Sequence, residues 1–146
     1  MTKKTKKTIL FSILGITAVG IAIGLYLYFK GPVNIKDSLG KKVSSTILYQ
    51  GFIADSIAAK KEYFDQILEV SGIVTRVSEN QQKQVIVFLK TDTPGSAINC
   101  TMEGPPENIR ENNSLIIKGI CTGLGSGDAD LGIPGDVYLG RCYLVK

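Results

Sequence analysis

Hydrophobic residues change their spacing twice along the chain, and each spacing predicts a different kind of element. Residues 9–29 carry no charge and are mostly apolar. As a helix with a rise of about 1.5 Å per residue they would be roughly 31 Å long, which matches the hydrocarbon core of a bilayer. Residues 47–64 have apolar side chains at spacings of three and four, which predicts an amphipathic helix. Beyond residue 65 the period becomes two, which predicts β-strands.

Five strands follow from this last pattern, at residues 66–77, 84–90, 97–102, 114–123 and 136–145. Gly72 interrupts the first strand, where it favours a bulge or a bend. Prolines within residues 104–112 indicate the start of a short helix between the third and fourth strands. Five strands with these two features have the element order of an OB-fold barrel. The predicted fold is therefore mainly β: a five-stranded OB-fold barrel preceded by one amphipathic α-helix, plus an N-terminal transmembrane helix.

These elements divide the chain into a basic cytoplasmic stub (1–8), a transmembrane signal anchor (9–29), a linker (30–43) and a helix plus OB-fold domain (44–146). The linker is assigned because its Gly, Pro, Lys, Asn and Ser residues show little periodicity. A cleaved signal peptide would have an apolar stretch of about 7–15 residues followed by small residues. Here the run is longer and ends in bulky side chains at residues 25–29, so we expect the anchor to remain uncleaved.

The lysines that flank the anchor predict its orientation. Four of them precede it, with no acidic residue among them: Lys3, Lys4, Lys6 and Lys7. Because cytoplasmic flanks carry the excess of basic residues, the N-terminus is expected inside. The chain would then be a single-pass protein of the inner (cytoplasmic) membrane, with its C-terminal domain in the periplasm or outside the cell.

The net charge of +4 arises entirely from the stub. Without those four lysines the 17 basic residues become 13, which equals the 13 acidic residues. The remainder of the chain is formally neutral, whereas a surface that binds nucleic acid needs clustered basic residues. Charge therefore argues against nucleic acid as a partner.

The residues that carry most chemistry are scarce. Histidine, the commonest general base and metal ligand, is absent. We find no catalytic residues, metal-ligand set or cofactor motif, and expect a non-catalytic protein without a cofactor. The three cysteines, at positions 100, 121 and 142, are too far apart for a CxxC site. In an oxidising compartment one pair could form a disulfide, for which we name Cys121 and Cys142; the alternative is three buried thiols.

A glycine-rich stretch at residues 123–136 allows three interpretations. Its glycines resemble a phosphate-binding loop, but no helix follows to present its N-terminus to an anion. Its aspartates, Asp128, Asp130 and Asp136, could coordinate calcium, but their spacing lacks the glycine and the terminal glutamate of an EF-hand. The favoured interpretation is a flexible hairpin loop at the rim of the barrel.

Several segments agree, in order, with one known family. They are "ADSIAAKKEYFDQILEVSGIVTRV" with Ala58, Ala59, Tyr63 and Gly72, "INCTM" with Cys100, "IIKGICTG" with Gly119 and Cys121, and "LGRCYLV" with Cys142. Over about residues 45–146 the chain resembles the tRNA_anti-like family of OB-fold domains, small bacterial proteins often found behind one membrane segment. Gln66 departs from the usual basic residue, and residues 124–135 form a longer loop. The resemblance implies the fold and the membrane-tethered setting, and it transfers no catalytic or binding residues.

By elimination, the expected function is that of a membrane-tethered, extracytoplasmic OB-fold interaction module. Its partner would be an envelope protein or a periplasmic small ligand, because OB barrels bind such partners through one face and its loops. The alternative is a nucleic-acid or nucleotide-binding OB domain on the cytoplasmic side, which requires inverted topology. On the second and third strands only Phe88 could stack on a base. No ligand-binding residue is assigned from the sequence.

Overall fold

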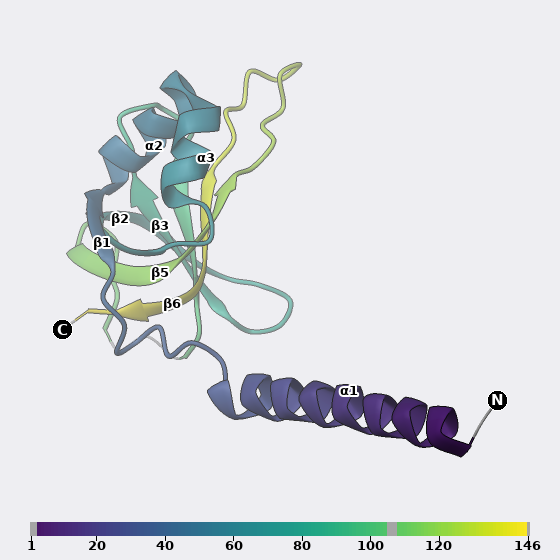
Figure 1. Ribbon diagram of the computed structural model, residues 1–146. Helices are drawn as coiled ribbons and strands as arrows, with labels where there is room; N and C mark the ends of the chain where they lie inside the picture. The colour runs from purple at the N-terminus through teal and green to yellow at the C-terminus, as the bar shows by residue number, and fades with distance from the viewer. Residues whose placement is uncertain (1–2, 105–107, 146) are drawn as a thin grey trace. The chain divides into compact units, whose positions relative to one another are not determined.

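The computed structural model describes residues 3–104 and 108–145, and the chain forms two compact units, Met1–Val33 and Asn34–Lys146. The first unit is dominated by helix α1 (Lys3–Lys30), shown in purple in Figure 1. Its segment Thr5–Lys30, with a mean hydropathy of 2.3, is long and apolar enough to cross a membrane, a property that signal sequences share. The hydroxyls of Ser12 and Thr17 donate to carbonyls four residues earlier, so these polar groups are satisfied within the helix.

The second unit contains a closed barrel of five strands: β2 (Ile67–Glu79), β3 (Val85–Lys90), β4 (Ala97–Met102), β5 (Ser114–Leu124) and β6 (Val137–Leu144). Their order is β2-β3-β4-β6-β5, and β5 returns to pair with β2. All these pairs are antiparallel except β4 with β6, which run parallel. The predicted mainly-β OB-fold barrel behind an apolar N-terminal helix is confirmed, and its strands begin and end within two residues of the predicted limits.

Strand β2 closes the barrel because it bends and pairs with different neighbours along its length. Its first half, Ile67–Ile73, pairs with β5, and its second half, from Val74, pairs with β3 after a register shift. Gly72 lies at this bend, where a Cβ would come within 2.8 Å of the Ser45 hydroxyl oxygen. The predicted bend at Gly72 is thus present, and the close approach of Ser45 explains why a residue without a side chain stands there.

The helical segment before the barrel is also confirmed, but it is broken in the middle. Helix α2 (Ser45–Ala54) ends at Asp55, and helix α3 (Ser56–Tyr63) begins directly after it. The Asp55 carboxylate accepts hydrogen bonds from the backbone N–H groups of Ile57 and Ala58. The expectation of one continuous helix over residues 47–64 was wrong at this point, because aspartate at an N-cap satisfies the first free N–H groups of a new helix.

The folded domain starts earlier than the sequence suggested. Residues 34–43, expected to be a linker, belong to the second unit: Ile35 is only 1% exposed. Strand β1 (Lys41–Ser44) pairs in parallel with the first half of β2. The sequence did not indicate this strand because its residues are mostly polar. The strand is held by its pairing with β2, and its own side chains make few hydrophobic contacts.

The two helices contribute apolar side chains to the barrel core. Leu48 and Phe52 of α2 and Ala59 of α3 join the interior residues of the strands in one cluster. Figure 1 shows both helices at the end of the domain from which the long β5–β6 connection extends. The predicted short helix within residues 104–112 falls partly on residues 105–107, which lie outside the described part of the chain; residues 108–113 form turns.

Candidate functional site

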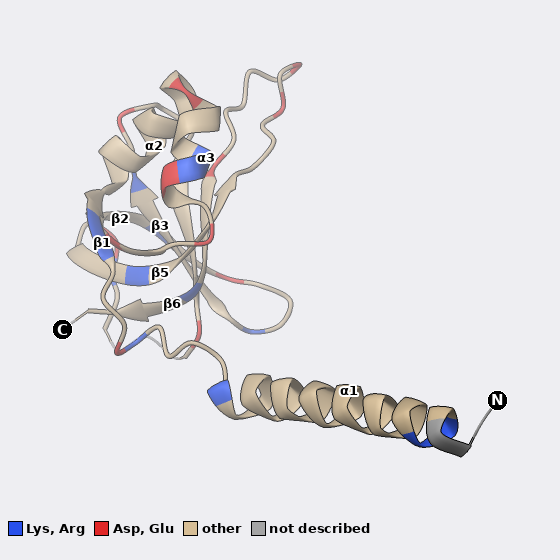
Figure 2. Cartoon of the chain, in the orientation of Figure 1, with Lys and Arg blue, Asp and Glu red and all other residues tan. Residues whose placement is uncertain are grey.

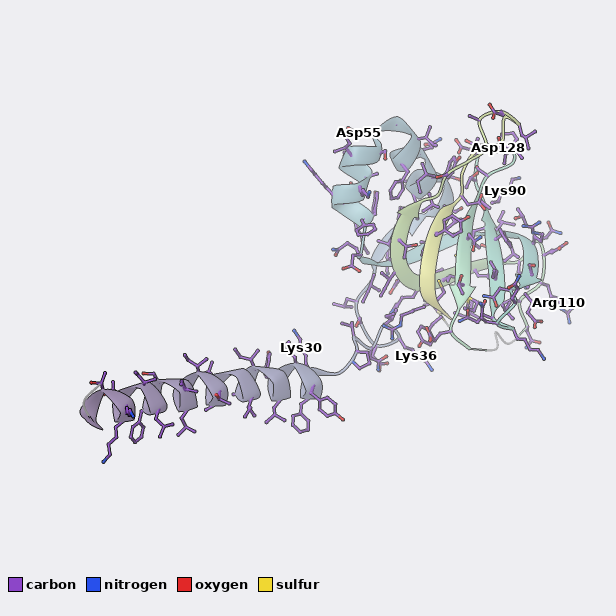
Figure 3. All side chains as sticks on the ribbon, turned by 90° about the vertical axis from the view of Figure 1, so that its right-hand side faces the viewer. Lys30, Lys36, Asp55, Lys90, Arg110 and Asp128 are labelled. Carbon is purple, nitrogen blue, oxygen red and sulfur yellow. The ribbon has the colours of Figure 1, made fainter. Side chains whose placement is uncertain are left out.

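Four side chains form a row across the outside of the barrel, and they are the candidate site: Arg76, Phe88, Asn99 and Tyr138, called the outer row below. The strand register places them side by side, Arg76 opposite Phe88, Phe88 opposite Asn99, and Asn99 opposite Tyr138. Their neighbours along β3, β4 and β6 point into the core, so these four point outward. Figure 3 views the barrel from the side on which β5, β6, β4 and β3 follow one another.

One end of the outer row is an aromatic ring covered by a cation. The guanidinium carbon of Arg76 lies 4.1 Å from the centre of the Phe88 ring, a cation–π geometry. Phe88 is only 8% exposed although it lies outside the core cluster. The Thr75 hydroxyl donates to the Phe88 carbonyl oxygen at 3.1 Å, which fixes the backbone beside the ring. A ligand could therefore reach the ring only if the guanidinium moved, or it could bind to the guanidinium itself.

The middle of the outer row is an amide with unused hydrogen-bonding capacity. Asn99 is 9% exposed, yet its side chain makes no hydrogen bond to any other described residue. A carboxamide presents two N–H donors and an acceptor oxygen in one plane. The fully buried side-chain polar atom without a partner among the described residues is the Tyr49 hydroxyl, so the Asn99 amide atoms reach solvent and can exchange water for a ligand's hydrogen bonds.

The other end of the outer row is an exposed tyrosine ring beside the β5–β6 connection. Tyr138 is 42% exposed, and a Cβ on Gly125 would lie 2.4 Å from its ring. The connection is fixed at its base, because the Asp136 carboxylate accepts a hydrogen bond of 2.8 Å from the N–H of Ala97. The outer row thus combines a ring available for stacking, an amide and a guanidinium, which are groups suited to binding.

A sequence profile of the tRNA_anti-like family matches residues 1–130, which is most of the chain. The chain belongs to the tRNA_anti-like family. This confirms the resemblance noted in the sequence, although the match begins at the N-terminus and ends within the β5–β6 connection, so that Tyr138 lies beyond it. A search of curated proteins finds no match.

Charge does not single out the outer face of this tRNA_anti-like domain. Figure 2 shows basic and acidic residues interspersed over the strands and helices of the second unit. Arg76 lies on Phe88, and Lys90 follows two residues after Phe88 at the end of β3. This distribution agrees with the formal neutrality of the chain after the stub.

The β5–β6 connection is a hairpin, as its composition suggested, and parts of its backbone lie very close together. At Gly127 an added Cβ would lie 2.2 Å from the Ile133 carbonyl oxygen, and at Gly135 it would lie 2.0 Å from that of Gly125. Two hydrogen bonds of 2.8 Å link Asp128 and Ile133. The glycines therefore let two backbone segments lie against each other as a tight ribbon, and we call residues 125–136 the glycine arm.

Two of the three aspartates of the glycine arm accept hydrogen bonds from backbone N–H groups. Asp128 accepts hydrogen bonds from the N–H groups of Asp130 and Leu131, and Asp136 holds Ala97. Among the described residues there is no group of three or more potential metal ligands. The calcium interpretation therefore gains no support from the arrangement of these residues, and no helix follows the arm to support the phosphate interpretation.

The three cysteines of the tRNA_anti-like domain are interior residues. Each is 0% exposed and present as a free thiol, so the disulfide between Cys121 and Cys142 stays a prediction. A hydrogen bond with the Cys142 thiol, together with burial, raises the pKa of Cys100 well above its ordinary value. Burial also raises the pKa of Cys121. Thiols held in this way are poor nucleophiles, because the thiolate is the reactive form.

Proposed function

We propose that this protein is a membrane-tethered, extracytoplasmic interaction module that binds a protein or small ligand through the outer row and performs no chemistry on it. The observation that carries the proposal is the unpaired amide of Asn99 between the ring of Phe88 and the exposed ring of Tyr138. Flat groups or extended chains that stack on the tyrosine ring could also hydrogen-bond to the amide. This is the face through which OB barrels generally bind their partners.

The location outside the cytoplasm rests on the anchor. Helix α1 has the length and composition of a membrane-spanning segment, and its four lysines lie on the N-terminal side. The positive-inside bias would keep those lysines in the cytoplasm and carry the barrel across the bilayer. Residues 31–33 are then the whole connection between the helix and the folded domain.

The absence of a chemical step is proposed on two grounds. The sequence has no histidine, and the interior thiols have raised pKa values, which is the opposite of the lowered value that activates a cysteine nucleophile. The outer row offers stacking, hydrogen bonding and one cation, which are means of binding.

The location is tested with a reporter enzyme that is active only outside the cytoplasm, fused after the C-terminus of the full chain. Activity is expected for this fusion, and a fusion at residue 8 is expected to be inactive. An inactive C-terminal fusion, together with activity of a cytoplasm-specific reporter at the same position, would contradict the proposed topology.

Binding is tested with a photo-crosslinking amino acid introduced at Tyr138 of the full chain in its membrane. A crosslinked product is expected from this position and from Phe88, whereas Gln82, an exposed residue of the β2–β3 turn, is the matched control. The Asn99→Ala variant should reduce the yield at Tyr138 several-fold. Equal yields from Tyr138 and Gln82, unaffected by Asn99→Ala, would contradict a binding role of the outer row.

A nucleic-acid or nucleotide binder on the cytoplasmic side is the second candidate, and one observation favours it. The outer row holds two aromatic rings and a guanidinium, where the sequence indicated one aromatic residue. Bases stack on such rings, and a guanidinium can pair with phosphate. This candidate predicts salt-sensitive binding of a single-stranded oligonucleotide, weakened by Arg76→Ala, in fluorescence anisotropy. Binding that is absent at low salt would exclude it.

A further inference from the structure

The tip of the glycine arm exposes two aliphatic side chains on a hydrogen-bonded hairpin. Leu131 is 71% exposed and Ile133 is 51% exposed. The ribbon beneath them is fixed by the paired hydrogen bonds between Asp128 and Ile133 and by the close backbone contacts at Gly127 and Gly135. Ordering such a tip costs little further entropy when it binds, which is what a docking element requires.

Two acidic residues lie next to this apolar tip in the chain. Asp128 and Asp130 are both exposed, and the Asp130 carboxylate has no hydrogen-bond or ion-pair partner among the described residues. An acidic pair beside aliphatic groups is unsuited to the surface of an anionic bilayer, which attracts basic segments. It is suited to a surface with an apolar centre and basic residues beside it.

Helix α3 carries a surface with those properties. A shallow hollow of about 420 Å³ is lined by Ser56, Ile57, Lys60 and Lys61. Ile57 is 73% exposed and supplies the apolar surface. Neither lysine forms an ion pair within the described chain: Lys60 lies over the Phe64 ring at 5.7 Å, and Lys61 has no partner there.

The arm and the hollow lie at the same end of the domain but do not cover each other. Figure 3 labels Asp128 on the arm and Asp55 at the start of α3 at one end, with Lys36 at the other. The high exposures of Leu131 and Ile57 show that neither is covered within one chain. Two complementary surfaces at one end allow two chains to exchange contacts about a two-fold axis, each arm in the hollow of the other.

We propose that the glycine arm docks into the α3 hollow of a second copy of this chain, forming a reciprocal dimer. Leu131 and Ile133 contact Ile57 of the second copy, while Asp128 and Asp130 face its Lys60 and Lys61. Opposite charge sets the orientation of the two chains, and the aliphatic contact excludes water from it. This proposal is independent of the function assigned to the outer row.

The contact is tested by crosslinking two differently tagged full-length chains in nanodiscs. One chain carries Leu131→Cys, the other Ile57→Cys, and a short bismaleimide joins thiols that lie close together. The native cysteines are fully buried and leave the introduced ones as the accessible thiols. A strong mixed product is expected. The matched control is Leu39→Cys, which is 98% exposed and should give at least a tenfold lower yield with Ile57→Cys.

A charge exchange tests whether the ion pairs hold the contact. Asp130→Lys in the first chain, or Lys61→Asp in the second, should each lower the mixed product about fivefold. Combining both variants should restore it, because the pair is then re-formed with its signs reversed. Both variants alter exposed positions, so thermal melting should stay unchanged and exclude a folding defect.

Two results would overturn the proposal. One is a yield with Ile57→Cys no higher than that of the Leu39→Cys control, or a yield that the charge exchange leaves unchanged. The other is quenching of a fluorophore at Leu131→Cys by spin-labelled lipid in the same nanodiscs, which would assign the arm to the bilayer.

Discussion

Residues along β3 and β4 point alternately into the barrel and out of it, and the two faces differ in whether their side chains carry unpaired polar groups. Inside the barrel, Val87, Leu89 and Ile98 are 0% exposed and packed into one cluster. Outside, Asn99 is almost as inaccessible, but its amide has no partner among the described residues. The interior side chains of these two strands are apolar and need no hydrogen-bond partner, whereas the outer row presents an amide that a ligand could pair with. Changes that crowd or unpair interior groups should alter stability, and changes in the outer row should lower binding.

The largest effect on stability is expected at Gly119, where the interior has no room for an added methyl group. A Cβ on Gly119 would lie 2.5 Å from the Cys142 sulfur and 3.1 Å from the Gly140 carbonyl oxygen. Gly119→Ala should therefore lower the free energy of unfolding by about 3 kcal/mol, measured by urea denaturation. Gly140→Ala is the control, because its Cβ would meet nothing closer than 4.0 Å.

A second variant separates crowding from any other cause. Adding Cys142→Ala to Gly119→Ala removes the sulfur that is too close, so the pair should be more stable than the sum of the single changes implies. Strict additivity would contradict the crowding explanation.

The next largest effect on stability concerns an ion pair on the outside of the barrel that is covered by residues 36–38. The Lys118 ammonium lies 3.3 Å from the Glu69 carboxylate and donates to the carbonyl oxygens of Lys36 and Ser38. The side chains of Lys118 and Glu69 are only 12% and 15% exposed. Lys118→Met should lower stability by about 2 kcal/mol in urea denaturation, because it leaves a largely buried carboxylate and two carbonyls unpaired. Adding Glu69→Gln should recover part of the loss; no recovery would show that Lys118 acts through packing alone.

The interior thiols should make stability depend on alkaline pH. Cys100 and Cys121 have raised pKa values in the folded protein, so stability is fully present below the ordinary value of 9.0 and falls as pH rises above it, because the unfolded chain then gains thiolate. The loss is at most about 1.4 kcal/mol per pH unit for each thiol. Urea midpoints measured from neutral pH to about pH 10.5 should fall less steeply for Cys121→Val than for the native chain. Identical slopes would contradict the burial of this thiol.

The Tyr49 hydroxyl is an unpaired polar group in the interior, and it can be compared with the unpaired amide on the outer face. The Tyr49 hydroxyl is fully buried without a hydrogen-bond partner among the described residues. Since no ligand can reach it, this hydroxyl only costs free energy. Tyr49→Phe should raise the free energy of unfolding by about 1 kcal/mol in urea denaturation. A loss of stability would instead reveal a partner, such as a buried water molecule.

The smallest effect on stability is expected in the outer row. Asn99→Leu keeps the volume of the side chain and removes an unpaired amide, so the free energy of unfolding should change by less than about 0.5 kcal/mol. The crosslinking yield at Tyr138 should nevertheless fall several-fold. A destabilisation of more than about 1.5 kcal/mol would show that the amide has a partner within the chain.

The sequence predicts most elements of this fold because apolar residues recur in them at the regular spacing of a helix or a strand. The period of two places Leu68, Val70 and Val74 on one face of the first strand, and all three are fully buried. The break at Asp55 was missed because apolar spacing continues across it, while a cap is a local hydrogen-bond effect. Strand β1 was missed because its pattern is polar and its pairing with β2 is parallel and remote in sequence.

The outer row was only partly predictable for a related reason. Phe88 could be recognised as an aromatic residue of its strand, but residues 85–89 are all apolar, so alternation does not show that it points outward. Tyr138 joins the same row only because β6 lies beside β4, although β5 and the glycine arm separate them in the chain. An exposed aromatic residue flanked by the buried Val137 and Leu139 was the signal, but its neighbour across the sheet depends on strand order, which periodicity does not encode.

Strand β1 has a mechanical consequence. It lies outside the ring of strands that closes the barrel, and it is the first strand that tension applied at Asn34 would load. Its hydrogen bonds join only four residue pairs to β2. A pull on the N-terminal side would therefore peel away this short strand and extend the chain by about ten residues, each adding roughly 3.5 Å, while the closed barrel stays intact.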